Sequence, residues 1–304
     1  MPGSRRKSAI SPVIATIILI GIFVAVVSAA LGFAFDELSS YYAQSDLQQS
    51  NSVSTQVAQG INSVALTFGR SVSVGYSFRY ASVAVVPDVI QYVITVVSPN
   101  CPHSVCTIYA YTGMLMIAIP GHYFSLGNNY QAVIYPTGFV PSNTFVSKGG
   151  SGSMSVSFSK EFENPAGGGE NLYTVVVPVP LEINTTQTLT SSAKPTPVIR
   201  LYVVQLSSVG QPYQLASNCT AKPPSATVSV FNLKSGYISV QGQGEQVCTI
   251  FNILKVQVSE YNNDNTLYPP QFFGFAQVGQ SISYNSPSNV TLQVFVGDVG
   301  IGGA

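Results

Sequence analysis

The residues that most often carry hydrolytic chemistry are few in this chain and widely separated. The two histidines are His103, between two cysteines, and His122, after a Pro-Gly pair. Neither belongs to a G-x-S-x-G or H-E-x-x-H motif, the patterns that activate a nucleophile or place two zinc ligands on one helix face. Glu161 and Glu163 imitate a pair of catalytic carboxylates, but their place beside Lys160 and a glycine-rich stretch is typical of a solvated hairpin end. We predict no catalytic residue and no enzyme.

Metal and cofactor sites have equally little support. Cys101, His103 and Cys106 offer zinc ligands, but a second close cluster of ligands is missing. Residues 262–265 carry oxygen donors for calcium without the spacing of an EF-hand, so we interpret them as a turn. The glycines of residues 300–303 are not followed by a helix and do not form a phosphate-binding loop. The sequence therefore predicts no metal and no cofactor.

The four cysteines instead suit disulfide bonds in an oxidising compartment. Four cysteines permit three pairings. We favour Cys101 with Cys106 and Cys219 with Cys248, because each pair then lies on one side of a candidate boundary at residues 190–197. The second bond would contribute roughly 3–4 kcal/mol on the chain-entropy model.

Three Asn-x-Ser/Thr triplets are acceptor sites for N-linked sugars if the chain meets the transferase. They begin at Asn184, Asn218 and Asn289. Sugars at these positions would hydrate a surface that has few charges.

The charge composition excludes some classes of protein. Only 8% of the 304 residues are charged, and 12 basic residues balance 12 acidic ones. A nucleic-acid binder needs a basic surface to displace phosphate counterions, so we predict no nucleic-acid partner. Because 46% of the residues are hydrophobic, with 17 Tyr and 16 Phe, a disordered chain is excluded as well.

The most distinctive segment lies near the N-terminus. Three basic residues, Arg5 to Lys7, are followed by 28 residues without a charge before Asp36. As a helix, residues 10–35 would span about 39 Å, more than the ~30 Å hydrocarbon core of a bilayer. A buried core helix is normally shorter and shows a polar stripe, and a secretory signal has a shorter apolar core. The segment is predicted to span a membrane and to be retained.

The flanking charges predict the orientation of this segment. Basic residues precede it, and Asp36 and Glu37 follow it. By the positive-inside rule, the N-terminus lies in the cytoplasm and the chain beyond about residue 36 lies outside.

Hydrophobic periodicity predicts the fold class, which is α+β: a long N-terminal hydrophobic α-helix followed by an all-β, sandwich-like globular head. Ser11-Pro12 is a typical helix start, and the helix is expected to continue, amphipathic, to about residue 60. Period-two patterns predict strands at residues 71–78, 89–97, 173–179, 198–206, 227–231, 253–258 and 290–296. The head, residues 61–304, is either one large sandwich or two modules, 61–190 and 198–304.

The stretch RRKSAISPVIATIILI, residues 5–20, resembles the N-terminus of archaeal type IV pilins. The likeness covers about the first 35 residues. It implies that a prepilin peptidase removes a short leader, residues 1–8, on the cytoplasmic side, leaving the assembly helix to begin at residue 9. The cut would fall between Ser8 and Ala9, or between Ala9 and Ile10, with Lys7 as the basic residue before the bond. Similar leaders occur on archaellins and on some solute-binding proteins of archaea.

Leader removal has a physical consequence in this reading. Without its basic residues the apolar helix can leave the bilayer, and it then needs another apolar environment, which a bundle of identical helices supplies. A head-to-tail contact that does not close generates a filament. Unlike the wider pilin pattern, the helix has no acidic residue near its mature start, so no carboxylate there guides assembly. The apolar side chains expected in the bundle are Pro12, Ile14, Ile17, Leu19, Phe23, Val27, Leu31 and Phe35.

The resemblance therefore implies a structural subunit of an extracellular pilus, a homopolymer used for adhesion. Its partners would be the prepilin peptidase, the pilus assembly machinery and, before assembly, the cytoplasmic membrane. An archaellin of a motility filament and a membrane-anchored solute- or sugar-binding protein are the alternatives.

Overall fold

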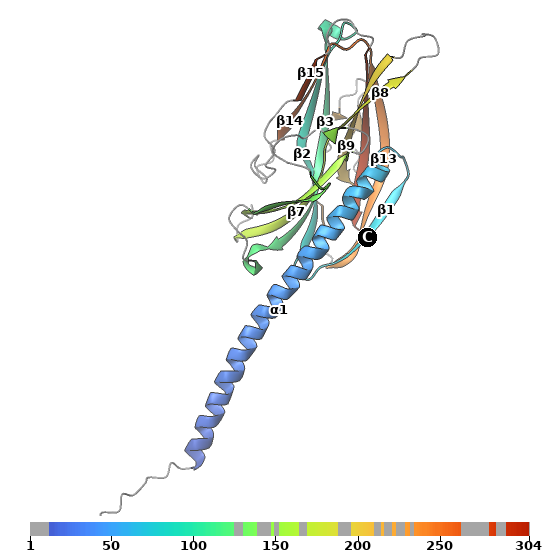
Figure 1. Ribbon diagram of the computed structural model, residues 1–304. Helices are drawn as coiled ribbons and strands as arrows, with labels where there is room; N and C mark the ends of the chain where they lie inside the picture. The colour runs from blue at the N-terminus through green and yellow to red at the C-terminus, as the bar shows by residue number, and fades with distance from the viewer. Residues whose placement is uncertain are drawn as a thin grey trace, which may run out of the picture.

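A computed structural model describes residues 12–124, 130–138, 147–148, 152–163, 169–187, 196–209, 214–215, 221–222, 229–231, 234–262, 280–283 and 290–303. One long helix, α1 (Pro12–Val64), leads into a strand-rich head. The first half of α1 projects away from the head and the second half lies along it (Figure 1). The predicted α+β class and the helix start at Pro12 are confirmed, and the helix continues four residues beyond the predicted end at residue 60.

Two sheets make up most of the head. The first has six strands in the order β1 (Ser71–Ser77), β13 (Ser235–Ile250), β16 (Thr291–Gly303), β9 (Thr196–Ser208), β8 (Leu181–Gln187) and β5 (Ser147–Lys148). The second follows the order β15 (Gln280–Ser283), β14 (Lys255–Asn262), β2 (Ser82–Val97), β3 (Val105–Pro120), β7 (Glu170–Pro178), β6 (Ser155–Glu163) and β4 (Gln131–Tyr135), with β12 (Ser229–Phe231) also paired to β2. A separate ribbon joins β10 (Gln214–Leu215) to β11 (Ala221–Lys222), and 3₁₀ turns lie at Pro102–Ser104 and Gly121–Tyr123.

Strand pairing crosses the candidate boundary at residues 190–197. In the first sheet, β1 pairs with β13, and in the second, β2 pairs with β14. Each sheet therefore takes strands from both the 61–190 and the 198–304 parts of the chain. The pairing gives the head two sheets that each span both parts, rather than a separate set of sheets for each part.

Two hydrophobic clusters form the core, and successive residues of β2 contribute to different ones. Ala84 and Val86 belong to the cluster between the sheets, which also holds Tyr92. Val83 and Val85 belong to the cluster that includes α1. The central strands are buried on both faces at this level because the helix covers one face and the opposite sheet covers the other.

Candidate assembly interface and the neck that holds it

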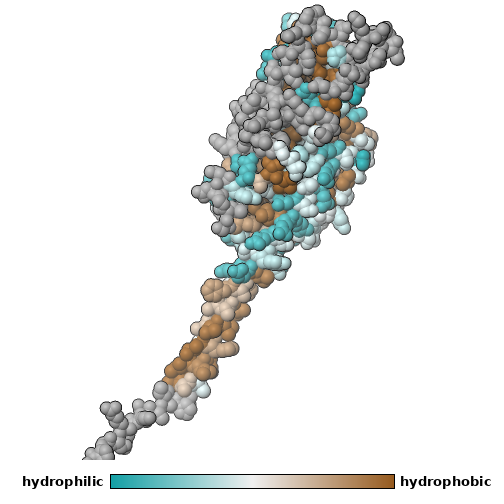
Figure 2. Space-filling model, in the orientation of Figure 1, coloured by the Kyte–Doolittle hydropathy of each residue, from teal (hydrophilic) through white to brown (hydrophobic). Residues whose placement is uncertain are grey.

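The first half of α1 exposes apolar side chains all around its axis. We call residues 14–38 the projecting segment. Four successive residues, Ile17 to Ile20, are each more than half exposed, so no face of the helix is covered. Figure 2 shows this rod as an apolar surface below the more polar head. By length and composition, α1 is able to cross a membrane.

Seven of the eight predicted assembly residues lie on this projecting segment. All seven are exposed, from 37% at Val27 to 69% at Leu19. Pro12 is the first residue of α1, and its side chain lies outside the described set. The exposed members are Ile14, Ile17, Leu19, Phe23, Val27, Leu31 and Phe35.

The second half of α1 is built into the core of the head. Val53, Val57, Ile61 and Val64 recur every three or four residues, the spacing that aligns side chains on one helix face, and each is at most 2% exposed. The cluster they join contains residues of both sheets. At about 1.5 kcal/mol or more for each buried side chain, this stripe fixes the helix firmly to the head.

Hydrogen bonds set the rotation of this half. The Asn62 side chain donates from Nδ2 to Ser153 Oγ at 2.9 Å, and its Oδ1 accepts from the Met154 backbone N–H at 2.9 Å. One turn earlier, Ser155 Oγ donates to the carbonyl of Ala58 at 2.8 Å. These hydrogen bonds join the helix to residues at the start of β6. They fix the rotation of the helix about its own axis.

Two glycines let the end of the helix lie directly on the first sheet. A Cβ built at Gly242 would overlap the carbonyl oxygen of Thr67, and one built at Gly297 would overlap that of Ala65. Both positions therefore exclude any larger side chain unless the backbone shifts.

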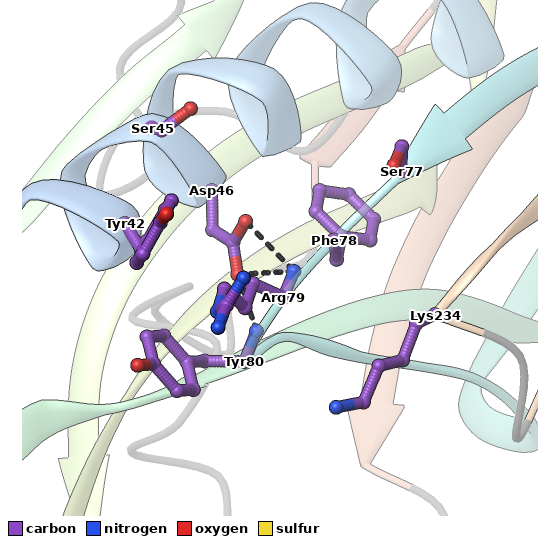
Figure 3. Close-up of a pocket in the computed structure, with 8 residues that line it drawn as sticks. All are labelled: Tyr42, Ser45, Asp46, Ser77, Phe78, Arg79, Tyr80 and Lys234. Carbon is purple, nitrogen blue, oxygen red and sulfur yellow. Dashed lines mark hydrogen bonds between the residues drawn. The ribbon is translucent and has the colours of Figure 1, made fainter. Parts of the chain in front are cut away.

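Hydrogen bonds between Asp46 and the backbone of residues 79–81, which we call the neck tie, hold α1 to the head at the level where the helix emerges. The Asp46 carboxylate is 4% exposed and accepts backbone N–H bonds from Tyr80 at 2.7 Å, Ala81 at 3.0 Å and Arg79 at 3.1 Å. These donors belong to the turn between β1 and β2 (Figure 3). Hydrogen bonds to an ionised acceptor are stronger than neutral ones, so they compensate for burial of the charge.

Aromatic rings surround this tie. The Arg79 guanidinium carbon lies 4.3 Å from the centre of the Tyr42 ring, within cation–π range. The Tyr80 ring stacks on Tyr123 with centroids 4.8 Å apart, and its hydroxyl lies 3.4 Å from Ser39 Oγ. The turn between β1 and β2 and a distant 3₁₀ turn thus meet beside the helix.

Beside the tie is a cavity of about 600 Å³, which we call the neck pocket. Two of its residues, Arg79 and Lys234, are exposed cations, and neither forms an ion pair within the described residues. Asp46 is its single acid, and its oxygens already accept the backbone bonds above. The lining consists of Tyr42, Ser45, Asp46, Ser77, Phe78, Arg79, Tyr80 and Lys234 (Figure 3).

The predicted Cys101–Cys106 disulfide is confirmed, with an S–S distance of 1.98 Å. It closes the turn between β2 and β3, and it consumes both thiols that the zinc alternative with His103 required. Cys248 is buried on β13 and is also disulfide-bonded. Its predicted partner, Cys219, lies outside the described residues.

Among the predicted cleavage and glycosylation residues, the structure describes only Asn184. Asn184 lies on β8, opposite Ile199 of β9. The leader residues Lys7, Ser8, Ala9 and Ile10 and the acceptors Asn218 and Asn289 lie outside the described residues.

The carboxylates of the supposed hairpin end lie on β6. Glu163 is exposed and stands opposite Glu170 of β7. Partial burial, and then the negative charge of Glu170, raise the pKa of Glu161.

Sequence reasoning missed Asp46 and Asn62 as the residues that hold the helix. A signal for Asp46 was present, because it is the single charge between Glu37 and Arg70. Burial of an isolated carboxylate costs free energy unless hydrogen-bond donors compensate for it. A single carboxylate in an otherwise uncharged amphipathic helix therefore indicates that such donors face it. Asn62 had no comparable signal among the many Asn and Ser residues. Comparisons of the chain with protein-family models, curated proteins and solved structures gave no match.

Proposed function

We propose that this protein is the structural subunit of an extracellular filament of the type IV pilus class, polymerised through its projecting segment. The observation that carries the proposal is the contrast within one helix. Residues 14–38 expose apolar side chains on every side, and the residues after them are locked into the head. Such a helix presents an apolar rod for a partner and keeps the head attached to it.

The energetics favour burial of the rod. Fourteen large apolar side chains between Ile14 and Leu38 are exposed. At about 1.5 kcal/mol each, burial is worth on the order of 20 kcal/mol per helix before ordering costs are subtracted. A bilayer supplies this environment before assembly, and a bundle of identical helices supplies it afterwards.

The continuity of α1 supports a structural role, because one helix joins the head to the proposed filament core. The neck tie at Asp46 and the Asn62 bonds connect the head to the same helix that would form the filament core. The head therefore occupies a fixed place on the outside of such a filament. Adhesion through the mostly uncharged head surface is the proposed use.

Processing and location follow from the proposal. A prepilin peptidase removes residues 1–8 at the cytoplasmic face, and the assembly machinery extracts the helix from the membrane. The polymer then extends from the cell surface.

The test is electron microscopy of filaments sheared from cells that produce the chain, with peptide mass spectrometry of the same sample. We expect filaments whose subunits begin at Ala9 or Ile10. A mature chain that retains Arg5 to Lys7 would contradict the proposal. A chain found in membranes without filaments would indicate an anchored binding protein instead, and loss of swimming on deletion would indicate an archaellin.

A further inference from the structure

The helix that forms the rod carries three charged residues, and all are acidic. Asp46 is occupied by the neck tie. Asp36 and Glu37 lie near the head end of the projecting segment, where both are exposed. Within the described residues, neither makes an ion pair or hydrogen bond.

Helix geometry keeps these two acids away from the cations of their own head. Glu37 precedes Asp46 by two and a half turns, so it points to the opposite side of the helix and lies about 14 Å away along the axis. Asp36 is rotated by about 80° from Asp46 and is equally distant along the axis. Asp46 faces the turn that carries Arg79, so Asp36 and Glu37 are directed elsewhere.

The matching positive charges lie at the neck pocket. Arg79 and Lys234 line the same cavity, and both side chains are exposed (Figure 3). The Arg79 guanidinium packs over Tyr42, which leaves its N–H groups free to bind a carboxylate bidentately. One copy of the chain therefore presents an unpaired acidic pair and an unpaired basic pair on surfaces that do not meet.

We propose that, in the filament, Asp36 and Glu37 of one subunit bind Arg79 and Lys234 in the neck pocket of a second copy. The inference rests on the proposed function and names the contact that sets the register between subunits. Packing of helices into a bundle would take Asp36 and Glu37 out of water, which costs several kcal/mol per ion without a partner of opposite charge. The neck pocket lies beside the emerging helix, and its two exposed cations, Arg79 and Lys234, outnumber its single acid, Asp46, so it supplies that partner.

The contact defines an axial offset between the two subunits. Arg79 lies at the level of Tyr42 and Asp46 of its own helix. To bring residues 36 and 37 of the second copy to that level, its helix must be displaced by about 8 to 15 Å along the axis. A filament reconstruction should contain a contacting pair of subunits with this offset.

The experiment uses the full-length chain produced in cells, with the yield of sheared filaments measured relative to total chain. Asp36→Asn with Glu37→Gln, and separately Arg79→Gln with Lys234→Gln, should each lower the yield about tenfold, which corresponds to about 1.4 kcal/mol of contact energy. The four-residue combination should lower it no further, because both double variants remove the same contact. Neutral replacements leave the Lys/Arg asymmetry of the membrane segment unchanged.

The matched controls are Lys255→Gln on β14 and Glu163→Gln on β6, which should keep the wild-type yield. Wild-type yields in both double variants, or additive losses in the combination, would overturn the contact and leave the filament proposal standing. Absence of filaments from the wild-type chain would overturn both. Thermal unfolding of each variant reports whether the head has folded.

Carbodiimide cross-linking tests the contact directly in intact filaments. The reagent joins a carboxylate to a lysine amine as an amide and takes up the water that is released. In intact filaments we expect a covalent ladder of subunits and a linked peptide pair joining Lys234 to Asp36 or Glu37. The Lys234→Arg variant should lose this pair. Wild-type filaments that give a covalent ladder of subunits without the linked peptide pair of Lys234 would contradict the proposed contact.

Discussion

The carboxylate of Asp46 in the helix accepts a 2.7 Å hydrogen bond from the backbone N–H of Tyr80 in the head. The bond spans 34 residues of sequence and lies where the helix emerges. It couples the position of the projecting segment to the position of the head.

Asp46→Asn should weaken this coupling. The amide keeps one oxygen but removes the charge and gives an NH₂ group that faces backbone donors. We expect the free energy of unfolding to fall by about 1–3 kcal/mol. Thermal unfolding of the full chain in detergent measures the change. Asp36→Asn, which alters an exposed acid on the same helix, is the control, and equal losses in the two variants would contradict the tie.

Gly297→Ala should be strongly destabilising. The added methyl group would overlap the Ala65 carbonyl oxygen, so the helix end or β16 must move. We expect a loss of about 1–3 kcal/mol, as for overpacking. Denaturant unfolding compares it with Gly244→Ala, a position where a Cβ meets nothing within 4 Å. Similar stabilities for the two variants would show that the close approach is unimportant.

The raised pKa of Glu161 predicts that the stability of the protein depends on pH. Because burial and Glu170 raise its pKa in the folded state, the folded chain holds the proton longer than the unfolded chain. Stability associated with this group is therefore highest below the unfolded pKa and falls as the pH rises through the folded pKa. Glu161→Gln should stabilise the protein at pH 7 and have little effect at pH 3, as measured by thermal unfolding. An equal gain in Glu245→Gln at pH 7 would assign the effect to overall charge instead.

Leu19→Glu should abolish filaments. Leu19 is 69% exposed on the projecting segment, and a carboxylate there would enter an apolar bundle without a partner. Leu19→Met, which keeps volume and polarity, should assemble normally. Electron microscopy of material sheared from cells gives the number of filaments. Abundant filaments from Leu19→Glu would show that the Leu19 side chain lies outside the proposed helix bundle.

The sequence was sufficient for the helix and for many strands. An uncharged run of 28 residues and the Ser11-Pro12 start predicted α1, and alternating residues predicted most of β1, β7 and β9. It did not predict β3, where Met114 to Ile119 form a continuous apolar run. These residues are buried on both faces of the strand, and such a run has no period-two signal.

The neck could not be predicted from local pattern. Asp46 gains its role from N–H groups of residues 79–81, and Lys234 enters the same pocket from a segment more than 150 residues later. Long-range strand pairing, such as β1 with β13, creates that proximity, and periodicity does not reveal which strands pair. The Cys101–Cys106 pair was easier to predict, because the two cysteines are only five residues apart in the sequence.

The place of β16 in the sheet bears on the order in which the head folds. This strand ends at Gly303, yet it lies in the interior of the six-stranded sheet, antiparallel to β13 on one side and parallel to β9 on the other. A nascent chain that already contains every earlier strand still has a gap between β13 and β9, because β16 fills that place. The six-stranded sheet therefore reaches its final form only after β16 has been synthesised. Chains that stop before β16 would be left with open sheet edges on β13 and β9.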